Sequence, residues 1–363
     1  MRIKFVIGSL EAGGAQRVLI LLSERLVKHG HEVTVLTING TKNDCFSLPK
    51  RVRRQALNLW SGLQVLLNLP KLRAALRSSK PDVIVSFIDI MNMVTLLTTR
   101  GLHLPVVVSE RSAPGAFEER PFLNWVRGRV YRFASRIIVQ NQGALDYFLP
   151  RFREKLAIIP NPVVRPPEIS SAPRLFSRPQ VLAVGRLYEV KQFDRLIAAF
   201  AMIKDKHADW GLTIVGDGPL KRVLKKLGKD LELGDRLSLP GYLASPYVLL
   251  KQADLFVMSS RFEGFPNALC EAMACGLPVI ATDCPTGPRE VIRDGIDGLL
   301  VKNEDTIAIS EAMDRLMSDE AERRRLASKS AEIIQRFDLE RITQLWESVF
   351  MESIGSKKEK HTV

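Results

Sequence analysis

One pattern, repeated in both halves of the 363-residue chain, constrains the fold most strongly. A short apolar run is followed by a glycine-containing loop, an amphipathic segment and a second apolar run, first over residues 3–37 and again over residues 181–215. Continuous apolar runs are typical of parallel strands buried on both faces. Strand–helix–strand units of this kind build doubly wound sheets. The sequence therefore predicts an α/β protein with two doubly wound, Rossmann-like domains.

Further apolar runs extend both predicted sheets, and a proline-rich stretch separates them. We expect a first domain over residues 1–162, a linker over 163–178, a second domain over 179–337, and a helix over 338–355 that packs back on the first domain. Ligands of doubly wound sheets bind beyond the carboxyl ends of the strands, so we expect the two domains to face a central cleft that holds the active site. The additional strands are predicted at 83–87, 106–109, 137–139, 156–159, 236–239, 255–258, 279–281 and 298–301.

The positive charge of the chain is concentrated in its first half. Residues 1–165 contain 25 Lys and Arg against 11 Asp and Glu, whereas the remaining residues contain 28 against 29. Such asymmetry indicates a surface that meets polyanions, with a basic face without a partner as the alternative. Nucleic acid is disfavoured, because the chain has no recognisable recognition motif.

Two stretches of this basic half, residues 50–80 and 120–136, place aromatic and aliphatic side chains beside arginines. This composition is typical of helices that lie on an anionic membrane surface. Core helices with solvated basic backs are the alternative. The side chains expected at the membrane are Arg51, Arg53, Arg54, Trp60, Trp125, Arg127, Arg129 and Arg132.

Cysteine usage and hydropathy indicate the compartment. The four cysteines have neither zinc-site spacing nor the density of a disulfide scaffold, which favours a reducing environment. No uncharged apolar stretch reaches the length of a membrane span. We therefore expect a cytoplasmic protein.

Two glycine loops follow predicted strands and could hold an anion. Gly13 and Gly14 open the first helix, where backbone amides and the helix dipole favour negative charge; a tight turn without a ligand is the alternative. Because the loop is not GxGxxG, a nicotinamide-dependent oxidoreductase is a secondary hypothesis. In the second half, Arg186 and Lys191 follow a strand, and their charges suit a diphosphate. Solvated surface charge is the alternative reading there.

The most specific stretch is residues 261–278. Glu263 follows a predicted strand, the loop leads into a helix, and Glu271 lies on that helix eight positions later. Amides at the start of the helix suit phosphate or sugar hydroxyls, and Glu271 suits a ribose diol. A neighbouring loop, residues 216–219, is predicted to be a structural turn.

These motifs resemble retaining glycosyltransferases of family 4, which have the GT-B fold. The resemblance covers nearly the whole chain and rests on Glu263 and Glu271 with their flanking segments, on Arg186 and Lys191, on residues 216–219, and on residues 13–15. It implies that Arg186 and Lys191 bind the donor diphosphate, Glu271 the ribose and Glu263 the donor sugar. It also implies donor contacts from Gly13 and Gly14, and from the backbone of Gly264, Phe265, Pro266, Asn267, Ala268 and Leu269.

One departure from the family concerns the segment after the strand at 106–109. Many relatives place a histidine there against the transferred sugar, whereas this chain has Arg111, preceded by Glu110. We expect these two residues to contact sugar or an acceptor phosphate, with Glu110 orienting Arg111; a purely structural pair is the alternative.

Residues 7–15 and 107–112 are similar to those of bacterial enzymes that extend glycans on polyprenyl-diphosphate carriers. The resemblance thus implies a nucleotide-sugar donor, with UDP favoured over GDP, and a lipid-linked glycan acceptor. It also implies a peripheral position on the inner face of the cytoplasmic membrane, and chemistry that needs no metal or cofactor. Alternatives are a soluble glycan acceptor, a GT-B nucleotide-sugar epimerase, and a catalytically silent homologue that only binds membranes.

Overall fold

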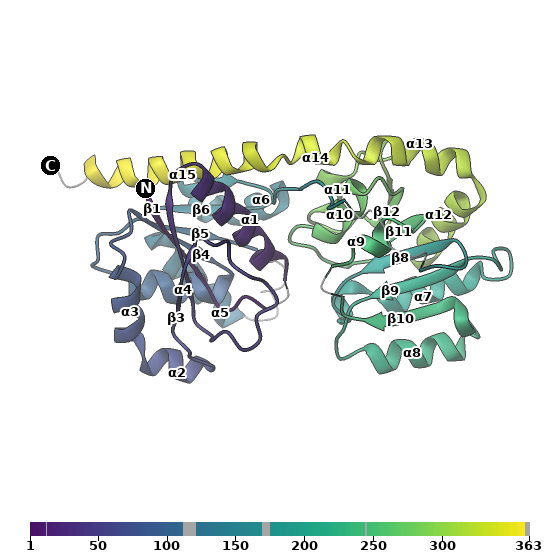
Figure 1. Ribbon diagram of the computed structural model, residues 1–363, viewed down its shortest axis with the longest axis horizontal. Helices are drawn as coiled ribbons and strands as arrows, with labels where there is room; N and C mark the ends of the chain where they lie inside the picture. Colours follow the sequence, from purple (N-terminus) through teal and green to yellow (C-terminus); the bar gives the residue numbers. More distant parts are fainter. Residues whose placement is uncertain (12, 112–120, 169–174, 244, 360–363) are drawn as a thin grey trace. The chain divides into compact units, whose positions relative to one another are not determined.

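The chain forms two compact units, each built on a parallel sheet with helices on both faces. The computed structural model describes residues 1–11, 13–111, 121–168, 175–243 and 245–359 (Figure 1). The amino-terminal unit comprises Met1–Pro162 with Phe337–Val363, and the carboxyl-terminal unit Val163–Arg336. The predicted class, α/β with two Rossmann-like sheets, is confirmed. Residues 169–174 of the predicted linker lie outside the described residues.

The sheet of the amino-terminal unit has the strand order β3-β2-β1-β4-β5-β6-β7, and all of its pairings are parallel. This arrangement aligns the carboxyl ends of β4 to β7 along one edge. The strands are β1 (Arg2–Ile7), β2 (Glu32–Thr37), β3 (Arg53–Ala56), β4 (Val83–Phe87), β5 (Val106–Ser109), β6 (Arg136–Val139) and β7 (Leu156–Ile158).

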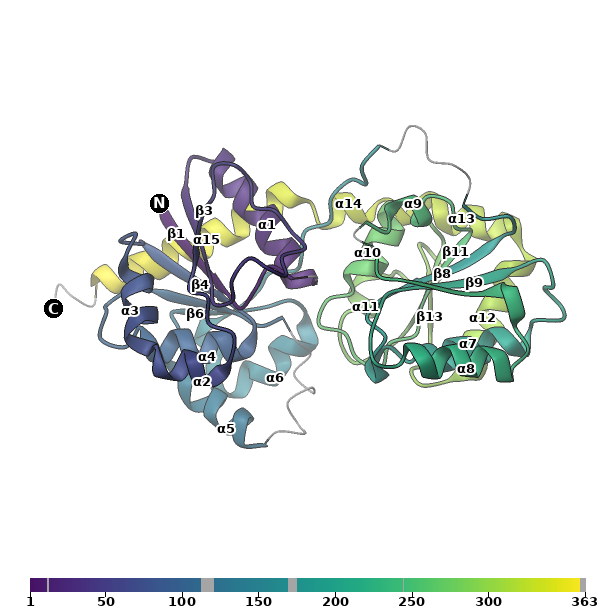
Figure 2. The ribbon, with the colours of Figure 1, turned by 60° about the horizontal axis from the view of Figure 1, so that its bottom comes forward.

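Two hydrophobic cores, one on each face, hold this sheet between helices. Alternate residues of β1 point to opposite faces: Phe5 packs with α1 and α15, whereas Val6 packs with α3, α4 and α6. Figure 2 shows this layering. The helices are α1 (Gly14–Lys28), α2 (Gly62–Leu67), α3 (Leu69–Arg77), α4 (Asp89–Thr98), α5 (Pro121–Val130), α6 (Gln142–Phe152) and α15 (Leu339–Glu359), with 3-10 turns at Tyr131–Phe133 and Arg153–Lys155.

The carboxyl-terminal unit repeats this architecture with the strand order β10-β9-β8-β11-β12-β13. Helices α7, α8 and α12 cover one face through a core that includes Phe200 and Trp210, and α10 packs on β11 and β12. The strands are β8 (Gln180–Val184), β9 (Gly211–Val215), β10 (Leu237–Gly241), β11 (Leu255–Met258), β12 (Val279–Thr282) and β13 (Leu299–Val301). The helices are α7 (Phe193–Met202), α8 (Lys221–Asp230), α9 (Tyr247–Leu250), α10 (Asn267–Ala274), α11 (Pro288–Val291), α12 (Thr306–Ser318), α13 (Glu320–Ser330) and α14 (Ile333–Arg336), with 3-10 turns at Glu189–Lys191 and Gly234–Arg236.

The structure corrects the prediction of a basic interfacial helix at the start of residues 50–80. Residues 53–56 form the edge strand β3, paired with β2. Arg54 forms an ion pair with Asp44 and donates to the Thr37 hydroxyl, so its charge is compensated within the unit. Arg51 lies beside Val27 of α1, on the opposite face of the sheet from α3 to α6. Arg54 is therefore paired within the unit, and Arg51 does not share a face with α5.

Candidate active site

The loop that carries Arg186 is fixed by a close approach of two loops at the carboxyl ends of β8 and β9. Gly185 donates its amide to the Val215 carbonyl at 2.9 Å. Gly216 has φ +150°, and a Cβ on it would lie 1.8 Å from the Gly185 carbonyl oxygen, so no larger residue fits there. Loop 216–219 thus has the structural role predicted for it. Arg186, which follows Gly185, is exposed at this edge of the sheet. Its guanidinium carbon lies 5.4 Å from the Tyr188 ring centroid.

Lys191 and Glu263, which are 72 positions apart in the sequence, are in direct contact. Lys191 Nζ lies 2.5 Å from Glu263 Oε1, and Ser260 Oγ donates to the same oxygen at 2.6 Å. The Glu263 side chain is 9% exposed and that of Lys191 21%. The contact joins the loops that follow β8 and β11. Two of the three predicted catalytic residues therefore form one charged pair.

Further hydrogen bonds lock the Glu263 loop in place. Thr286 donates its hydroxyl to the Glu263 carbonyl, and Thr282 Oγ1 donates to the Ser260 carbonyl at 2.6 Å. No described residue donates a hydrogen bond to the second carboxylate oxygen of Glu263, Oε2. The carboxylate thus has one oxygen committed to the protein and one free to accept a hydrogen bond from a ligand.

Helix α10 begins at Asn267, directly after the Glu263 loop, and places Glu271 in its second turn. The side chains of Phe265 and Leu269 are buried in the core, so their predicted ligand contacts reduce to backbone groups. The predicted contact from the Asn267 amide is wrong for this structure, because that amide donates to the Phe265 carbonyl at 2.9 Å. Glu271 is partly exposed.

In the amino-terminal unit, Gly13 is the residue before α1 and Gly14 begins the helix. Gly13 is extended, with φ 175°, and its carbonyl accepts the Arg17 amide at 3.2 Å. The first turn of α1 contains no acidic residue, and no side chain caps it. Among the described residues, the positive end of the helix dipole thus has neither a side-chain cap nor a first-turn carboxylate, at the edge where β1 ends.

Glu110 does not orient Arg111, contrary to prediction. Its carboxylate is 2% exposed and accepts hydrogen bonds from Arg127 at 3.0 Å, Tyr131 at 2.5 Å and Asn92 at 3.3 Å. Burial, together with the nearby charge of Asp89, raises the pKa of Glu110 to about 7, against the opposing effect of Arg127. Both oxygens are occupied within the core, which leaves none for a sugar.

Arg127 is likewise misassigned by sequence, because it was expected at the membrane surface. Its side chain is 1% exposed and forms a buried ion pair with Glu110. It also donates to Asn124 and Tyr147. The spacing of Arg127 and Tyr131, one helical turn apart, is the signal that sequence reasoning missed. Arg129 and Arg132, in contrast, are exposed.

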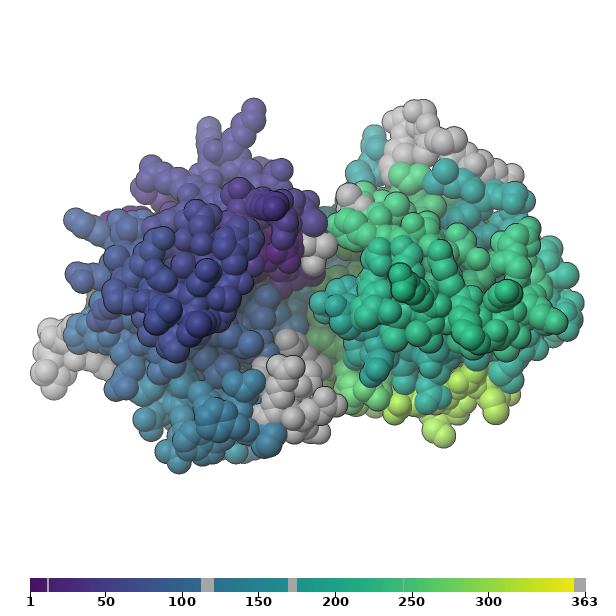
Figure 3. Space-filling view, turned by 90° about the horizontal axis from the view of Figure 1, so that it is seen from below, coloured from purple at the N-terminus to yellow at the C-terminus, as the bar shows by residue number. Residues whose placement is uncertain are grey.

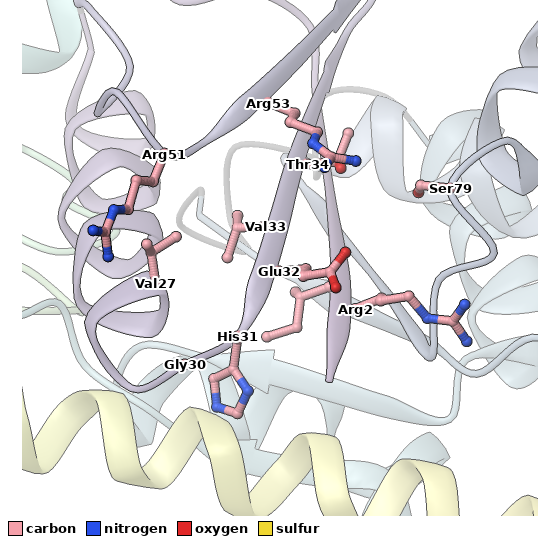
Figure 4. Close-up of a pocket in the computed structure, with 11 residues that line it drawn as sticks. Arg2, Val27, Gly30, His31, Glu32, Val33, Thr34, Arg51, Arg53 and Ser79 are labelled. Atoms are coloured by element: carbon pink, nitrogen blue, oxygen red, sulfur yellow. The ribbon is translucent and has the colours of Figure 1, made fainter.

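A cavity of about 310 Å³ lies in the amino-terminal unit at the amino ends of β1 and β2, the opposite edge of the sheet from Gly13 and Gly14. Figure 4 shows that the side chains of Arg2, Arg51 and Arg53 point in different directions around it. Arg2 is also paired with Asp82 at 2.8 Å. The three guanidinium groups do not converge on a common point, so this cavity is not built to bind a diphosphate.

Within the described ranges, no group of three or more His, Cys, Asp or Glu side chains is arranged to hold a metal ion. None of the helices described is both long and apolar enough to cross a bilayer. In the carboxyl-terminal unit, the candidate donor-binding residues are two cations, two carboxylates and the start of α10.

The fold and these loops define the GT-B class of two-domain glycosyltransferases. Among solved structures, the chain is similar to sucrose-phosphate synthase from Thermosynechococcus elongatus, with a TM-score of 0.83 at 22% identity over 98% of this chain and 99% of that one. It is also similar to Anabaena HepE in complex with UDP and glucose, with a TM-score of 0.82 at 21% identity over 96% and 99% of the two chains.

Two family models match in succession. Residues 12–164 match Glycosyltransferase Family 4, and residues 168–332 match Glycosyl transferases group 1. The chain therefore belongs to the glycosyltransferases that these two models describe.

A curated relative, 27% identical over 95% of this chain and 97% of its own length, is a Campylobacter jejuni enzyme named GalNAc-α-(1→4)-GalNAc-α-(1→3)-diNAcBac-PP-undecaprenol α-1,4-N-acetyl-D-galactosaminyltransferase. Another is the amylovoran biosynthesis glycosyltransferase AmsD of Erwinia amylovora, 27% identical over 94% and 97% of the two chains. The nicotinamide-dependent oxidoreductase considered from sequence is not supported.

Proposed function

We propose that this protein is a retaining, metal-independent glycosyltransferase that moves a sugar from a UDP-sugar to a polyprenyl-diphosphate-linked glycan in bacterial surface-glycan assembly. The observation that carries the proposal is the contact between Lys191 and Glu263 at the carboxyl edge of the second sheet, in a chain that belongs to a glycosyltransferase family. The names of two similar proteins support the proposed acceptor and donor. The Campylobacter enzyme is named for an undecaprenol-diphosphate acceptor, and HepE is described in complex with UDP.

In this proposal the four candidate charged residues of the carboxyl-terminal unit bind different parts of the donor. Arg186 and Lys191 bind the diphosphate, and their charges replace a metal ion in stabilising the leaving group. Oε2 of Glu263 accepts a hydrogen bond from a donor-sugar hydroxyl, and Glu271 accepts from the ribose diol. The backbone of Gly264, Ala268 and Leu269 adds dipoles near the phosphates. Gly13 and Gly14, at the start of α1, remain predicted donor contacts.

The reaction breaks the bond between the sugar C1 and the diphosphate oxygen, and the electron pair leaves with UDP. The acceptor hydroxyl oxygen bonds to C1 on the face that the diphosphate leaves, and its proton passes to the departing diphosphate. The configuration at C1 is therefore kept. Cations already in place around the diphosphate lower the barrier, because they need no reorganisation as charge develops.

We expect a screen of UDP- and GDP-sugars against a lipid-linked glycan to give transfer from a UDP-sugar, unchanged by EDTA. Proton NMR of the first-formed product should show the anomeric configuration of the donor. An inverted anomer would contradict the retaining mechanism, and loss of turnover in EDTA would contradict metal independence.

The same screen of donors and acceptors separates the alternative functions. Equal turnover of a lipid-free glycan would favour the soluble-acceptor enzyme, and conversion of the donor without any acceptor would favour the epimerase.

We also propose that the amino-terminal unit docks on an anionic membrane through α2 and α5. Helix α2 has no buried residue, and its Leu66 and Leu67 are 63% and 72% exposed. On α5, Trp125 is 56% exposed, with the Arg129 guanidinium 5.0 Å from its ring centroid. Both helices lie at the surface of this unit that is seen in Figure 3. Exposed apolar side chains flanked by cations are typical of helices that lie in a bilayer interface.

Liposomes containing acidic phospholipid should therefore bind the full chain, and binding should weaken as salt rises. Arg129→Glu with Arg132→Glu should lower the partition coefficient at least about 30-fold, because each cation near an anionic leaflet contributes about 1 kcal/mol. Leu66→Ser with Leu67→Ser should lower it further. Lys226→Glu with Arg324→Glu, two exposed cations of the carboxyl-terminal unit, serves as the control and should change little. Equal losses in both charge-reversal pairs would refute docking through α5.

A further inference from the structure

Arg111 is a residue of intermediate exposure, and no carboxylate among the described residues neutralises its guanidinium. Its Nη1 donates to Oδ1 of Asn161, but Nε and Nη2 are buried and have no hydrogen-bond acceptor in the described part of the chain. No described carboxylate forms an ion pair with it, since the adjacent Glu110 is committed to Arg127. Burial lowers the pKa of Arg111 to about 9. Such a group opposes folding unless something else compensates its charge.

The surroundings of Arg111 hold the guanidinium in place without neutralising it. Its central carbon lies 4.4 Å from the ring centroid of Phe87, at the end of β4, and 5.7 Å from that of Trp346 on α15. Asn161, which follows β7, is itself held by Gln140 Nε2 at 2.6 Å. Cation–π contacts compensate only part of the lost hydration. Segments after four neighbouring strands and one helix thus fix this cation at the ligand-binding edge of the sheet.

The two free nitrogens identify the kind of ligand. Nε and Nη2 form one side of the planar guanidinium, with two parallel N–H donors that match two oxygens of a phosphate group. A hydroxyl group would not neutralise the charge of the guanidinium, and it would not accept from both N–H donors. The ligand that fits is therefore an anion with paired oxygens.

We propose that Arg111 binds a phosphate of the lipid-linked acceptor, an inference that rests on the proposed function. The donor diphosphate is already provided for in the carboxyl-terminal unit by Arg186 and Lys191, whereas Arg111 belongs to the amino-terminal unit. The substrate class is thus a glycan acceptor that carries its own phosphate groups, such as a polyprenyl diphosphate.

Arg111→Met tests the proposal, because methionine fills similar space without a charge. We expect the unliganded variant to unfold at a higher temperature than the wild-type protein, since an uncompensated buried charge is removed. The KM for a short lipid-linked acceptor should rise about 30-fold, the effect of a lost charge-assisted fork, while the KM for the donor stays unchanged. Arg111→Lys should recover part of the loss. Arg153→Met, an exposed arginine of the same unit, is the matched control.

A binding measurement separates this inference from the proposed function. With UDP at saturation to fill the donor site, inorganic pyrophosphate should raise the unfolding temperature of the wild-type protein and of Arg153→Met, but not of Arg111→Met. This readout holds even if the wild-type protein transfers to no lipid-linked acceptor, in which case only the proposed function fails. The inference is overturned by equal pyrophosphate effects in all three proteins. It is also overturned by a rise in donor KM alone, or by an Arg111→Met variant that is destabilised yet keeps its kcat/KM per folded molecule.

Discussion

Replacing Arg186 or Lys191 by alanine is expected to lower kcat/KM for transfer at least about 100-fold, the effect of losing about 3 kcal/mol of stabilisation of developing negative charge. Both cations follow β8, and Lys191 is held 2.5 Å from Glu263. Steady-state kinetics against the donor measures the loss. Arg324→Ala and Lys226→Ala, exposed cations paired only within their own helices, should retain near-normal turnover.

A second variant distinguishes phosphate binding by Lys191 from simple neutralisation of Glu263. If Lys191 only neutralises that carboxylate, Lys191→Ala combined with Glu263→Gln should recover activity relative to Lys191→Ala alone. If Lys191 binds the diphosphate and Glu263 the sugar, the double variant should be no more active than either single one. We expect the second result. Recovery in the double variant would remove Lys191 from the catalytic residues.

Arg127→Met is expected to destabilise the amino-terminal unit by about 3–5 kcal/mol, because it leaves the Glu110 carboxylate buried and unpaired. The two side chains are each 1% exposed and lie 3.0 Å apart. Adding Glu110→Gln should restore much of the loss, since the uncompensated charge is then removed as well. Urea unfolding followed by fluorescence of Trp346, which is fully buried in the same unit, provides the measurement.

Arg129→Met is the matched control, because Arg129 lies two positions further along α5 and is exposed. Its effect on the free energy of unfolding should stay within about 0.5 kcal/mol. Equal effects of Arg127→Met and Arg129→Met would contradict the buried pair. Charge reversal at Arg127 is accordingly unsuitable as a probe of membrane binding, because it would unfold the protein it is meant to test.

The strands could be predicted because parallel strands covered on both faces are continuous apolar runs. Val83–Phe87, Val106–Ser109 and Leu255–Met258 match β4, β5 and β11 residue for residue. Strand β3 was missed because it is an edge strand, and its sequence Arg53–Ala56 is largely polar. Edge strands carry charge and lack the apolar signal of central ones.

The sequence predicts which loops carry the candidate site residues, but not which of these residues touch one another. Glycines and charges after strands indicate the carboxyl edge of a sheet, which is how Arg186, Lys191 and Glu263 could be chosen. Sequence alone does not show that Lys191 and Glu263 touch, because that pairing depends on the order of β8 and β11 in the sheet. The burial of Arg127 was missed for the same reason, since its partner Glu110 belongs to another element.

The membership of α15 in the amino-terminal unit has a consequence for biosynthesis. Trp346 and Phe350 are fully buried there, and Glu347 accepts hydrogen bonds from His29 and His31. During translation, the stretch 1–162 therefore emerges with one face of its sheet covered only in part, by α1, and it stays so until residues near 350 have left the ribosome. The carboxyl-terminal unit, continuous over 163–336, has its whole sequence available earlier. Vectorial synthesis thus completes the second unit before the first, reversing the usual amino-to-carboxyl order of domain folding.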